Sequence, residues 1–384
     1  MRTLYNIFLL TLFVPMLACG GGRSLLVTVE NPGDFERMRE TIAVPLKDVR
    51  KELEGVDVSR LVVSYAETGA SLLTQVTADE LLFQSDFKPQ ERKEFIITQS
   101  EKSGTRNQSL VDGRFVLPRE DYAWENDRIA FRMYGTALAG EVNNGIDVWT
   151  KRVRYLIVEK WYKESEGSPP DKNTYHEDRG EGADFFSVGR SLGAGGSGIW
   201  HNGKLYQPGV FSSQKTICNG PIRVAFELTY TNWNIDGKKF TELKRISLDA
   251  GQNLNRVDVM FMGLSPSDTL QIACGLVKRN NTTVLINEKD CWMSLWGLTN
   301  SDIVNGSLGT GVVLQASASV KFTEDKDQYL IIGNAMAGEP FTHFSGAGWT
   351  RSGDFQTADE WNTYLGTFSR RLQAPLKVSI AVKE

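Results

Sequence analysis

The stretch WENDRIAFRMYG, residues 124–135, decides the fold class of this chain because its polarity alternates along the sequence. Successive side chains of a β-strand point to opposite faces, so this alternation predicts a strand with one apolar and one polar face. Similar short runs, separated by turn residues, follow along the chain and are typical of an all-β antiparallel sandwich or barrel. The apolar face holds Ile129, Phe131 and Met133, and the polar face holds Arg128, Arg132 and Tyr134.

The length of 384 residues predicts two domains. The β-rich runs SLLVTVENP, RLVVSYAE, LLFQSDF and KEFIITQS predict a small N-terminal β-sandwich over residues 24–115. Residues 116–384 are expected to form a large antiparallel β-sandwich that carries the catalytic site. One short helix is expected in VPLKDVRKELEGV and another in TADEWNTYLGTFSRRL, where Thr357 and Glu360 have the spacing of a capping box.

Residues 1–18, MRTLYNIFLLTLFVPMLA, have the charged start and apolar middle of an export signal, and they are too short for a membrane-spanning helix. Cys19 follows in MLACG, which resembles a bacterial lipobox, and the glycines of residues 19–23 predict a flexible tether. The chain is therefore expected to be a lipoprotein, anchored through Cys19 in the periplasm or outer membrane of a Gram-negative bacterium. The membrane is expected as a partner only through this lipid.

The composition predicts a globular protein and argues against nucleic-acid binding. Hydrophobic residues make up 41% and charged residues 23%, and the formal net charge is −4, unlike the basic stripe of a nucleic-acid binder. Cys218, Cys274 and Cys291 form no CxxC pair and allow at most one internal disulfide. GAGGSG lacks the Gly-Lys-Ser/Thr ending of a phosphate loop, and no Gly-x-Ser-x-Gly elbow supports a serine hydrolase.

Arginine and tryptophan side chains in the second domain indicate a site for an acidic sugar. Arg128 and Arg132 must be solvated or line a site, because burying an unpaired arginine is costly. Guanidinium groups bind carboxylates through paired hydrogen bonds, and aromatic faces suit sugar rings. The substrate-binding candidates beside these two arginines are Arg223, Trp124, Trp149 and Trp349.

The decapeptide YHEDRGEGAD, residues 175–184, gathers titratable groups around one of the three histidines of the chain. His176 is surrounded there by carboxylates, an arginine and a tyrosine, with glycines that bend the backbone. Small environmental shifts move a histidine across neutral pH, so this composition predicts a catalytic loop. A solvated acidic loop that contains a histidine is the alternative.

Seven segments, in this order, resemble one bacterial family: WENDRIAFRMYG, GIDVWTKRV, KWY, YHEDRGEGADFFSVG, NGPIRVAFELTY, KRISLDAGQNLNRV and GWTRSGDF. That family, long catalogued as a domain of unknown function, occurs in polysaccharide-utilisation gene clusters. The resemblance covers nearly the whole mature chain and implies a large β-sandwich like the supersandwich of galactose-mutarotase-like proteins. It also implies an oligosaccharide dehydratase, which removes water from a non-reducing-end uronic acid and leaves a 4,5-unsaturated sugar.

That elimination requires a base with a pKa near neutral, an acid for the departing hydroxyl, and positive charge beside the carboxylate. His176 is the predicted base, and Tyr175 or Tyr134 is the predicted acid. Glu177 or Asp178 is expected to orient the imidazole, as a carboxylate orients other catalytic histidines. The predicted clamp for the uronate consists of Arg128, Arg132 and Arg179, and His201 is a second candidate histidine.

Several alternatives stay open at this point. No cofactor is expected, although a divalent cation held by His176, Glu177, Asp178 and Glu181 is a second source of positive charge. Neighbouring residues of a strand point to opposite faces, so these four side chains cannot all ligate from regular β structure. A glycoside hydrolase, a polysaccharide lyase or a non-catalytic glycan-binding lipoprotein would also take an acidic oligosaccharide as partner. An epimerase follows from the fold analogy alone.

Overall fold

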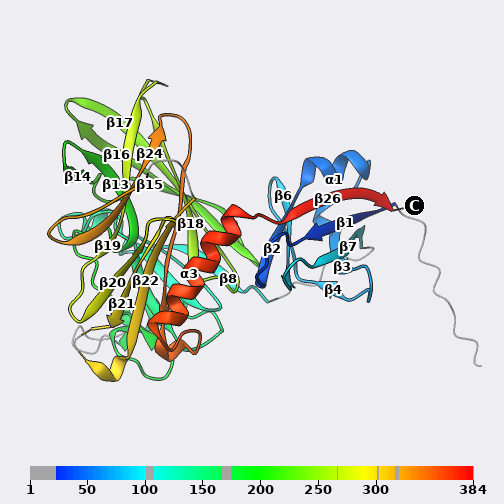
Figure 1. Ribbon diagram of the computed structural model, residues 1–384, viewed down its shortest axis with the longest axis horizontal. Helices are drawn as coiled ribbons and strands as arrows, with labels where there is room; N and C mark the ends of the chain where they lie inside the picture. The colour runs from blue at the N-terminus through cyan, green and yellow to red at the C-terminus, as the bar shows by residue number, and fades with distance from the viewer. Residues whose placement is uncertain are drawn as a thin grey trace, which may run out of the picture.

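The computed structural model describes residues 23–100, 108–166, 174–265, 267–300, 302–315 and 320–383. The predicted signal of residues 1–18, the lipidation candidate Cys19 and most of the predicted tether lie outside the described residues. The described chain forms two β-sheet bodies side by side, a larger and a smaller one, and α3 (Ala358–Gln373) lies between them (Figure 1). The predicted all-β fold class is confirmed.

The smaller body is a sandwich of two sheets with the strand orders β26-β1-β7-β3-β4 and β2-β6-β5. Its core follows the alternation of the sequence, because every second residue of β1 (Leu25, Val27 and Val29) is fully buried. The predicted short helix is α1 (Leu46–Glu52), which buries Leu46 and Val49. The strands are β1 (Ser24–Glu30), β2 (Arg37–Pro45), β3 (Leu61–Tyr65), β4 (Ser71–Leu72), β5 (Thr74–Val76), β6 (Glu80–Phe87), β7 (Arg92–Gln99) and β26 (Lys377–Lys383).

The structure corrects both predicted domain boundaries. β26, near the end of the chain, pairs with β1 from Ser24↔Lys383 to Glu30↔Lys377, so residues 377–383 belong to the smaller body (Figure 1). β8 (Val111–Val116), predicted for the smaller body, pairs with β9 of the larger one. Local pattern shows that a segment is a strand, but the partner of a strand is chosen by contacts distant in sequence.

The larger body consists of an eight-stranded sheet, β15-β16-β17-β18-β25-β22-β21-β20, and two five-stranded sheets, β12-β11-β10-β9-β8 and β14-β13-β19-β24-β23. The main core lies between them, where Tyr122 of β9 stacks on Phe226 of β16 at 3.9 Å between ring centroids. The remaining strands are β9 (Asp121–Asn126), β10 (Ile129–Met133), β11 (Asp147–Lys151), β12 (Gly182–Ala183), β13 (Ala194–His201), β14 (Lys204–Tyr206), β15 (Ser213–Asn219), β16 (Arg223–Ile235), β17 (Lys238–Asp249), β18 (Leu254–Met262), β19 (Thr269–Val277), β20 (Thr282–Asn287), β21 (Trp292–Leu298), β22 (Ser307–Leu314), β23 (Lys321–Glu324), β24 (Gln328–Met336) and β25 (Phe341–Trp349).

Helix α3 packs on the opposite face of the eight-stranded sheet. Its predicted N-cap is confirmed, because the Thr357 side chain accepts a hydrogen bond from the Glu360 N–H at 3.2 Å. Trp361 and Leu365 are fully buried against the sheet. A further helix, α2 (Val158–Glu166), was not predicted, and it packs over the sheet that contains β9, β10 and β11.

Candidate active site

The predicted polar face of β10 carries a buried arginine, Arg132. We call Arg132, Asp121, Asp147, Asp184 and Tyr134 the Arg132 cluster. Arg132 and Asp147 are register partners on β10 and β11, and the guanidinium Nη2 lies 2.6 Å from the Asp147 carboxylate. Arg132 Nη2 also donates to Asp184 at 3.0 Å and to the Tyr134 hydroxyl at 3.1 Å, and Nη1 lies 3.9 Å from Asp121. Three carboxyl groups therefore surround one guanidinium group.

Burial changes the acidity of every member of the Arg132 cluster for which a shift is resolved. Desolvation and then the neighbouring Asp147 raise the pKa of Asp184 well above its usual range. Desolvation also raises the pKa of Asp121 to about 6, against the opposing effect of Arg132. Burial opposes the charge of Arg132, but Asp147 and Asp184 outweigh it, so the pKa of Arg132 is raised. Such shifts are characteristic of functional sites, although structural ion-pair networks also produce them.

His176 lies at the edge of the Arg132 cluster, in a short 3₁₀ turn (Thr174–His176). Its Nδ1 is 3.0 Å from the main-chain oxygen of Asp184 and 3.6 Å from the carboxylate of that residue. A carbonyl oxygen only accepts, so Nδ1 carries the proton, and Nε2 of the neutral ring is an acceptor. Within the described residues Nε2 has no hydrogen-bond partner, and 48% of the side chain is exposed. His176 therefore combines a fixed orientation with access to solvent.

Tyr175 and Tyr134 are placed differently from the prediction. Tyr175 is buried and stacks on Trp149 at 4.9 Å, and its hydroxyl accepts a hydrogen bond from Arg119 at 2.9 Å. Desolvation and then Asp147 raise the pKa of Tyr134, whereas the predicted acid needed a lowered pKa. Tyr134 therefore does not meet the condition that the prediction set for the acid.

Neither predicted carboxylate orients the imidazole. Glu177 is exposed and pairs with Arg179 at 3.0 Å. The Asp178 side chain is 2% exposed and pairs with two guanidinium groups, Arg152 at 3.3 Å and Arg351 at 3.1 Å. The orienting residue is Asp184 at the end of the decapeptide. Sequence reasoning missed it because the chain returns after residue 176, so that the Asp184 N–H donates to the Tyr175 oxygen at 2.7 Å.

The predicted sugar-stacking tryptophans belong to the core. Trp124, Trp149 and Trp349 are each at most 1% exposed, so no sugar ring reaches their faces. Their indole N–H groups are satisfied internally, by Asn255 at 2.7 Å, Asp147 at 3.1 Å and the main-chain oxygen of Asn305 at 2.7 Å respectively. The assignment of these three residues to substrate binding is therefore wrong, because flat indoles also serve to pack sheets together.

The other predicted binding residues do not form one clamp beside His176. Arg132 has no free face, because it lies between the Tyr134 and Trp149 rings as well as its carboxyl partners. Arg128 pairs with Asp354 at 2.9 Å, and Arg223 pairs with Asp249 at 2.6 Å in a different part of the molecule. His201 pairs with Asp236 at 2.7 Å beside the β13–β14 hairpin. The predicted clamp of Arg128, Arg132 and Arg179 is therefore not assembled.

The described residues contain neither a cluster of metal-ligating side chains nor a helix that could span a membrane. No three His, Cys, Asp or Glu side chains gather there in a way that could hold a metal ion, so His176, Glu177, Asp178 and Glu181 do not form the alternative cation site. The same residues contain no helix long and apolar enough to cross a membrane. Cys218, Cys274 and Cys291 are free thiols.

Comparisons with known proteins place the chain in a family. A solved structure described as a protein in the glycosyl hydrolase family 38 from Enterococcus faecalis has 8% sequence identity and a TM-score of 0.48. That match covers 94% of this chain but only 47% of the other, so this chain spans about half the length of that protein. The "Uncharacterized protein P7" of Formosa agariphila is 32% identical over 380 residues, covering 92% of this chain and 93% of that protein. A family model also matches residues 29–378, and the chain belongs to this family, described as "Domain of unknown function (DUF4861)".

Proposed function

We propose that the protein is a carbohydrate-active enzyme that removes water by β-elimination from a non-reducing-end uronic acid of an oligosaccharide, giving a 4,5-unsaturated uronate. The observation that carries this proposal is the geometry of His176. Its Nδ1 is fixed by Asp184 and its Nε2 is exposed as a proton acceptor. The family resemblance of the seven sequence segments supports the choice of reaction.

A single residue, His176, can carry the proton in both steps of the elimination. His176 Nε2 removes the C5 proton, the C5–H electron pair forms the C4–C5 double bond, and the C4 hydroxyl departs. The imidazolium then returns the proton to the leaving oxygen, so the products are water and the unsaturated uronate. The main-chain oxygen of Asp184, 3.0 Å from Nδ1, accepts the Nδ1–H hydrogen bond in both the neutral ring and the imidazolium.

The enolate-like charge that develops on the uronate needs cations nearby. Arg132 cannot supply one, since it is buried and paired. Arg152 and Arg351 share the single carboxylate of Asp178, which leaves one positive charge beside the same loop. Arg179 is 57% exposed and pairs with Glu177, which is 70% exposed, at the surface of the molecule. We therefore assign carboxylate binding to Arg152, Arg351 and Arg179.

The place of action follows from the sequence. The export signal of residues 1–18 and the cysteine at position 19 support a lipid-anchored protein in the periplasm or outer membrane of a Gram-negative bacterium. An acidic oligosaccharide released by other enzymes would reach it there.

The decisive experiment uses the purified protein and oligosaccharides that end in a non-reducing uronic acid. We expect ultraviolet absorbance of the conjugated uronate to rise, with loss of one water and no chain cleavage by mass spectrometry. His176→Ala should abolish the rise, because no other group in the proposed step carries the proton. His201→Ala is the matched control, since that histidine is also partly exposed and also paired with an aspartate.

Each other result has a definite meaning. A rise accompanied by chain cleavage would identify a polysaccharide lyase, and saturated cleavage products would identify a hydrolase. An absorbance rise that survives in His176→Ala would remove His176 from the mechanism. No absorbance change with any uronate tested would refute the elimination.

A further inference from the structure

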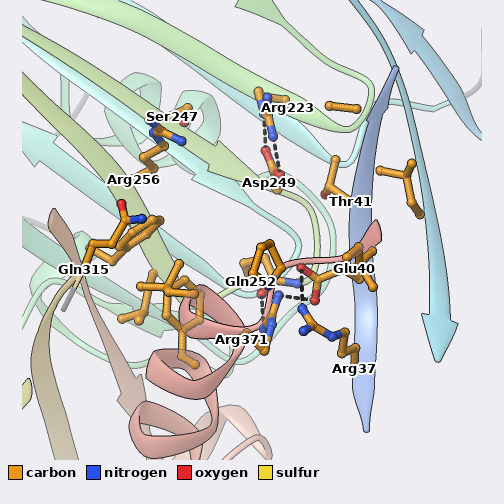
Figure 2. Close-up of a pocket in the computed structure, with 18 of the residues that line it drawn as sticks. Arg37, Glu40, Thr41, Arg223, Ser247, Asp249, Gln252, Arg256, Gln315 and Arg371 are labelled. Atoms are coloured by element: carbon orange, nitrogen blue, oxygen red, sulfur yellow. Dashed lines mark hydrogen bonds and ion pairs between the residues drawn. The ribbon is translucent and has the colours of Figure 1, made fainter. Parts of the chain in front are cut away.

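A cavity of about 450 Å³ lies where the two bodies meet, away from His176. Its floor is the outer face of the eight-stranded sheet, where Ser247, Arg256 and Phe344 form a row across β17, β18 and β25. One wall is the end of α3 with Phe368 and Arg371, and the facing wall is β2 of the smaller body (Figure 2). Three segments distant in sequence therefore build one cavity.

The lining of the cavity is rich in arginine, although the chain as a whole carries −4. Four arginines and two carboxylates line it, and two of the arginines also pair with carboxylates outside the lining, Arg223 with Glu80 at 3.2 Å and Arg256 with Asp258 at 2.9 Å. The arginines are Arg37, Arg223, Arg256 and Arg371, and the carboxylates are Glu40 and Asp249.

The uncompensated positive charge of the lining lies at Arg37 and Arg371. Arg37 and Arg371 share Glu40, at 3.7 Å and 2.6 Å, so one positive charge there has no partner among the lining carboxylates (Figure 2). Burial lowers the pKa of Arg37, and the neighbouring charge of Arg371 lowers it further. Arg371 also keeps a buried Nε–H without a hydrogen-bond acceptor in the described chain. An anion in the cavity would relieve this repulsion.

Arg256 supplies free donors on the opposite side. Its Nε binds Asp258 at 2.9 Å, and its Nη1 and Nη2 groups have no partner among the described residues. The side chain is 55% exposed. The ring of Phe344, its register partner on β25, lies between Arg256 and α3 and packs against Phe368. Charged donors therefore flank an aromatic surface, an arrangement suited to a ring that carries an acid group.

We infer that this cavity is a second binding site for an anionic saccharide, with the acid group held by Arg256 and Arg371 and the sugar ring on Phe344. We expect the site to bind without catalysing, because its two lining carboxylates, Glu40 and Asp249, are both held in ion pairs with arginines. That the ligand is anionic follows from the arginines alone. That it is an acidic sugar rests on the proposed function.

Calorimetric titration at low salt tests the inference. The probe is a disaccharide with glucuronate at its non-reducing end, and the protein carries His176→Ala so that no turnover occurs. We expect Arg256→Gln to weaken one binding event at least tenfold. Arg245→Gln is the matched control, because Arg245 is 56% exposed on the neighbouring strand, pairs with Glu227 and lies outside the cavity. It should change the affinity less than twofold, and near-ultraviolet circular dichroism should show both variants folded.

Other arms of the titration separate the parts of the inference. A disaccharide with glucose in place of glucuronate should bind at least tenfold more weakly, and equal binding would overturn the inference. Inorganic sulfate that binds as tightly as the disaccharide, with the same dependence on Arg256, would overturn the saccharide part. Equal affinities of Arg256→Gln and Arg245→Gln for the disaccharide would overturn the site altogether. The absorbance assay with unsubstituted His176 decides the proposed function independently of all three results.

Discussion

Arg132 shows how a buried charge determines the residues around it. Its side chain is 7% exposed, and removing a guanidinium group from water costs several kcal/mol unless carboxylates and hydrogen bonds compensate. Asp147, Asp184 and Asp121 provide that compensation, and Asp184 also holds His176 through its main-chain oxygen. The stability of the cluster and the orientation of the imidazole therefore share one residue, Asp184.

We expect Asp147→Asn to lower the free energy of unfolding by about 3–5 kcal/mol, because it leaves Arg132 without its shortest ion pair. Asp184→Asn should cost less, since burial and Asp147 already favour the neutral form of Asp184, which asparagine resembles. Urea denaturation at neutral pH measures both losses. A larger loss for Asp184→Asn would contradict this ranking.

A second prediction concerns His343, which is fully buried in the main body and donates through Nε2 to the main-chain oxygen of Gly195 at 2.9 Å. Desolvation lowers its pKa from 6.5 to about 4, and the charge of Lys244 adds to this effect. Between pH 6.5 and pH 4 His343 therefore binds a proton in the unfolded chain but not in the folded protein, so the free energy of unfolding falls as the pH drops below 6.5. The loss reaches about 3 kcal/mol near pH 4.

His343→Gln keeps a donor for Gly195 but does not titrate. Its stability should therefore fall by about 3 kcal/mol less than that of the unsubstituted protein between pH 7 and pH 4. Asp121 acts in the opposite direction, because its raised pKa of about 6 stabilises the fold as the pH falls below that value, equally in both proteins. Urea denaturation across this range is the measurement, and parallel pH profiles would exclude the role of His343.

At the scale of elements, α3 depends on glycines of the sheet beneath it. Gly309 and Gly311 alternate along β22 on the face that α3 covers, and their missing side chains let Trp361 and Leu365 approach the backbone. A Cβ atom on Gly309 would lie 2.6 Å from Trp361 Cδ1 and 2.7 Å from Trp296 Cε3. Neither neighbour is the end of a flexible chain.

Gly309→Ala should therefore destabilise the protein by about 1–3 kcal/mol through overpacking beneath α3. The control is Gly140→Ala, because a Cβ there would meet no atom within 4 Å. It should change the unfolding free energy by less than about 0.5 kcal/mol. Thermal unfolding followed by circular dichroism compares the two variants, and equal midpoints would show that α3 shifts to accommodate the methyl group.

At the scale of the whole molecule, the two bodies are joined by hydrogen bonds to main-chain groups. Gln75 of β5 is 3% exposed, accepts from the N–H groups of Ile222 and Arg223 at 2.8 and 2.7 Å, and donates to the Arg223 oxygen at 3.0 Å. Gln84 of β6 donates to the Ala250 oxygen at 2.9 Å. These hydrogen bonds therefore join the smaller body to the larger one beside the cavity described above.

Gln75→Ala removes the acceptor of two main-chain N–H groups, those of Ile222 and Arg223, and an unsatisfied buried donor costs about 1–3 kcal/mol, whereas the Arg223 oxygen keeps the Gly220 N–H at 3.0 Å. We expect unfolding of the smaller body to separate from that of the larger one, so that calorimetry shows an additional transition at lower temperature. Gln271→Ala, at an exposed position of β19, is the control and should leave the thermogram unchanged. An unchanged thermogram for Gln75→Ala would mean that the bodies are coupled by other contacts.

The local sequence pattern was sufficient to predict several strands and a helix, but not to predict which strands pair. Alternation in β1 and β10 and the capping spacing at Thr357 predicted two strands and a helix correctly, because these features depend on near neighbours. α2 was missed because it is short and follows a strand-like run. The partner of β26 was missed because seven residues of alternating polarity fit the edge of any sheet.

The sequence by itself determined the all-β class, the position of α3 and the candidate histidine, because periodicity, capping and residue chemistry are local properties. Only the tertiary structure decided which charges are compensated and which are available. It buried Arg132 and the three tryptophans, set Asp184 rather than Glu177 or Asp178 behind His176, and brought Arg256 and Arg371 to one cavity. The physical reason is that desolvation and ion pairing depend on contacts between residues far apart in the chain, which no local pattern encodes.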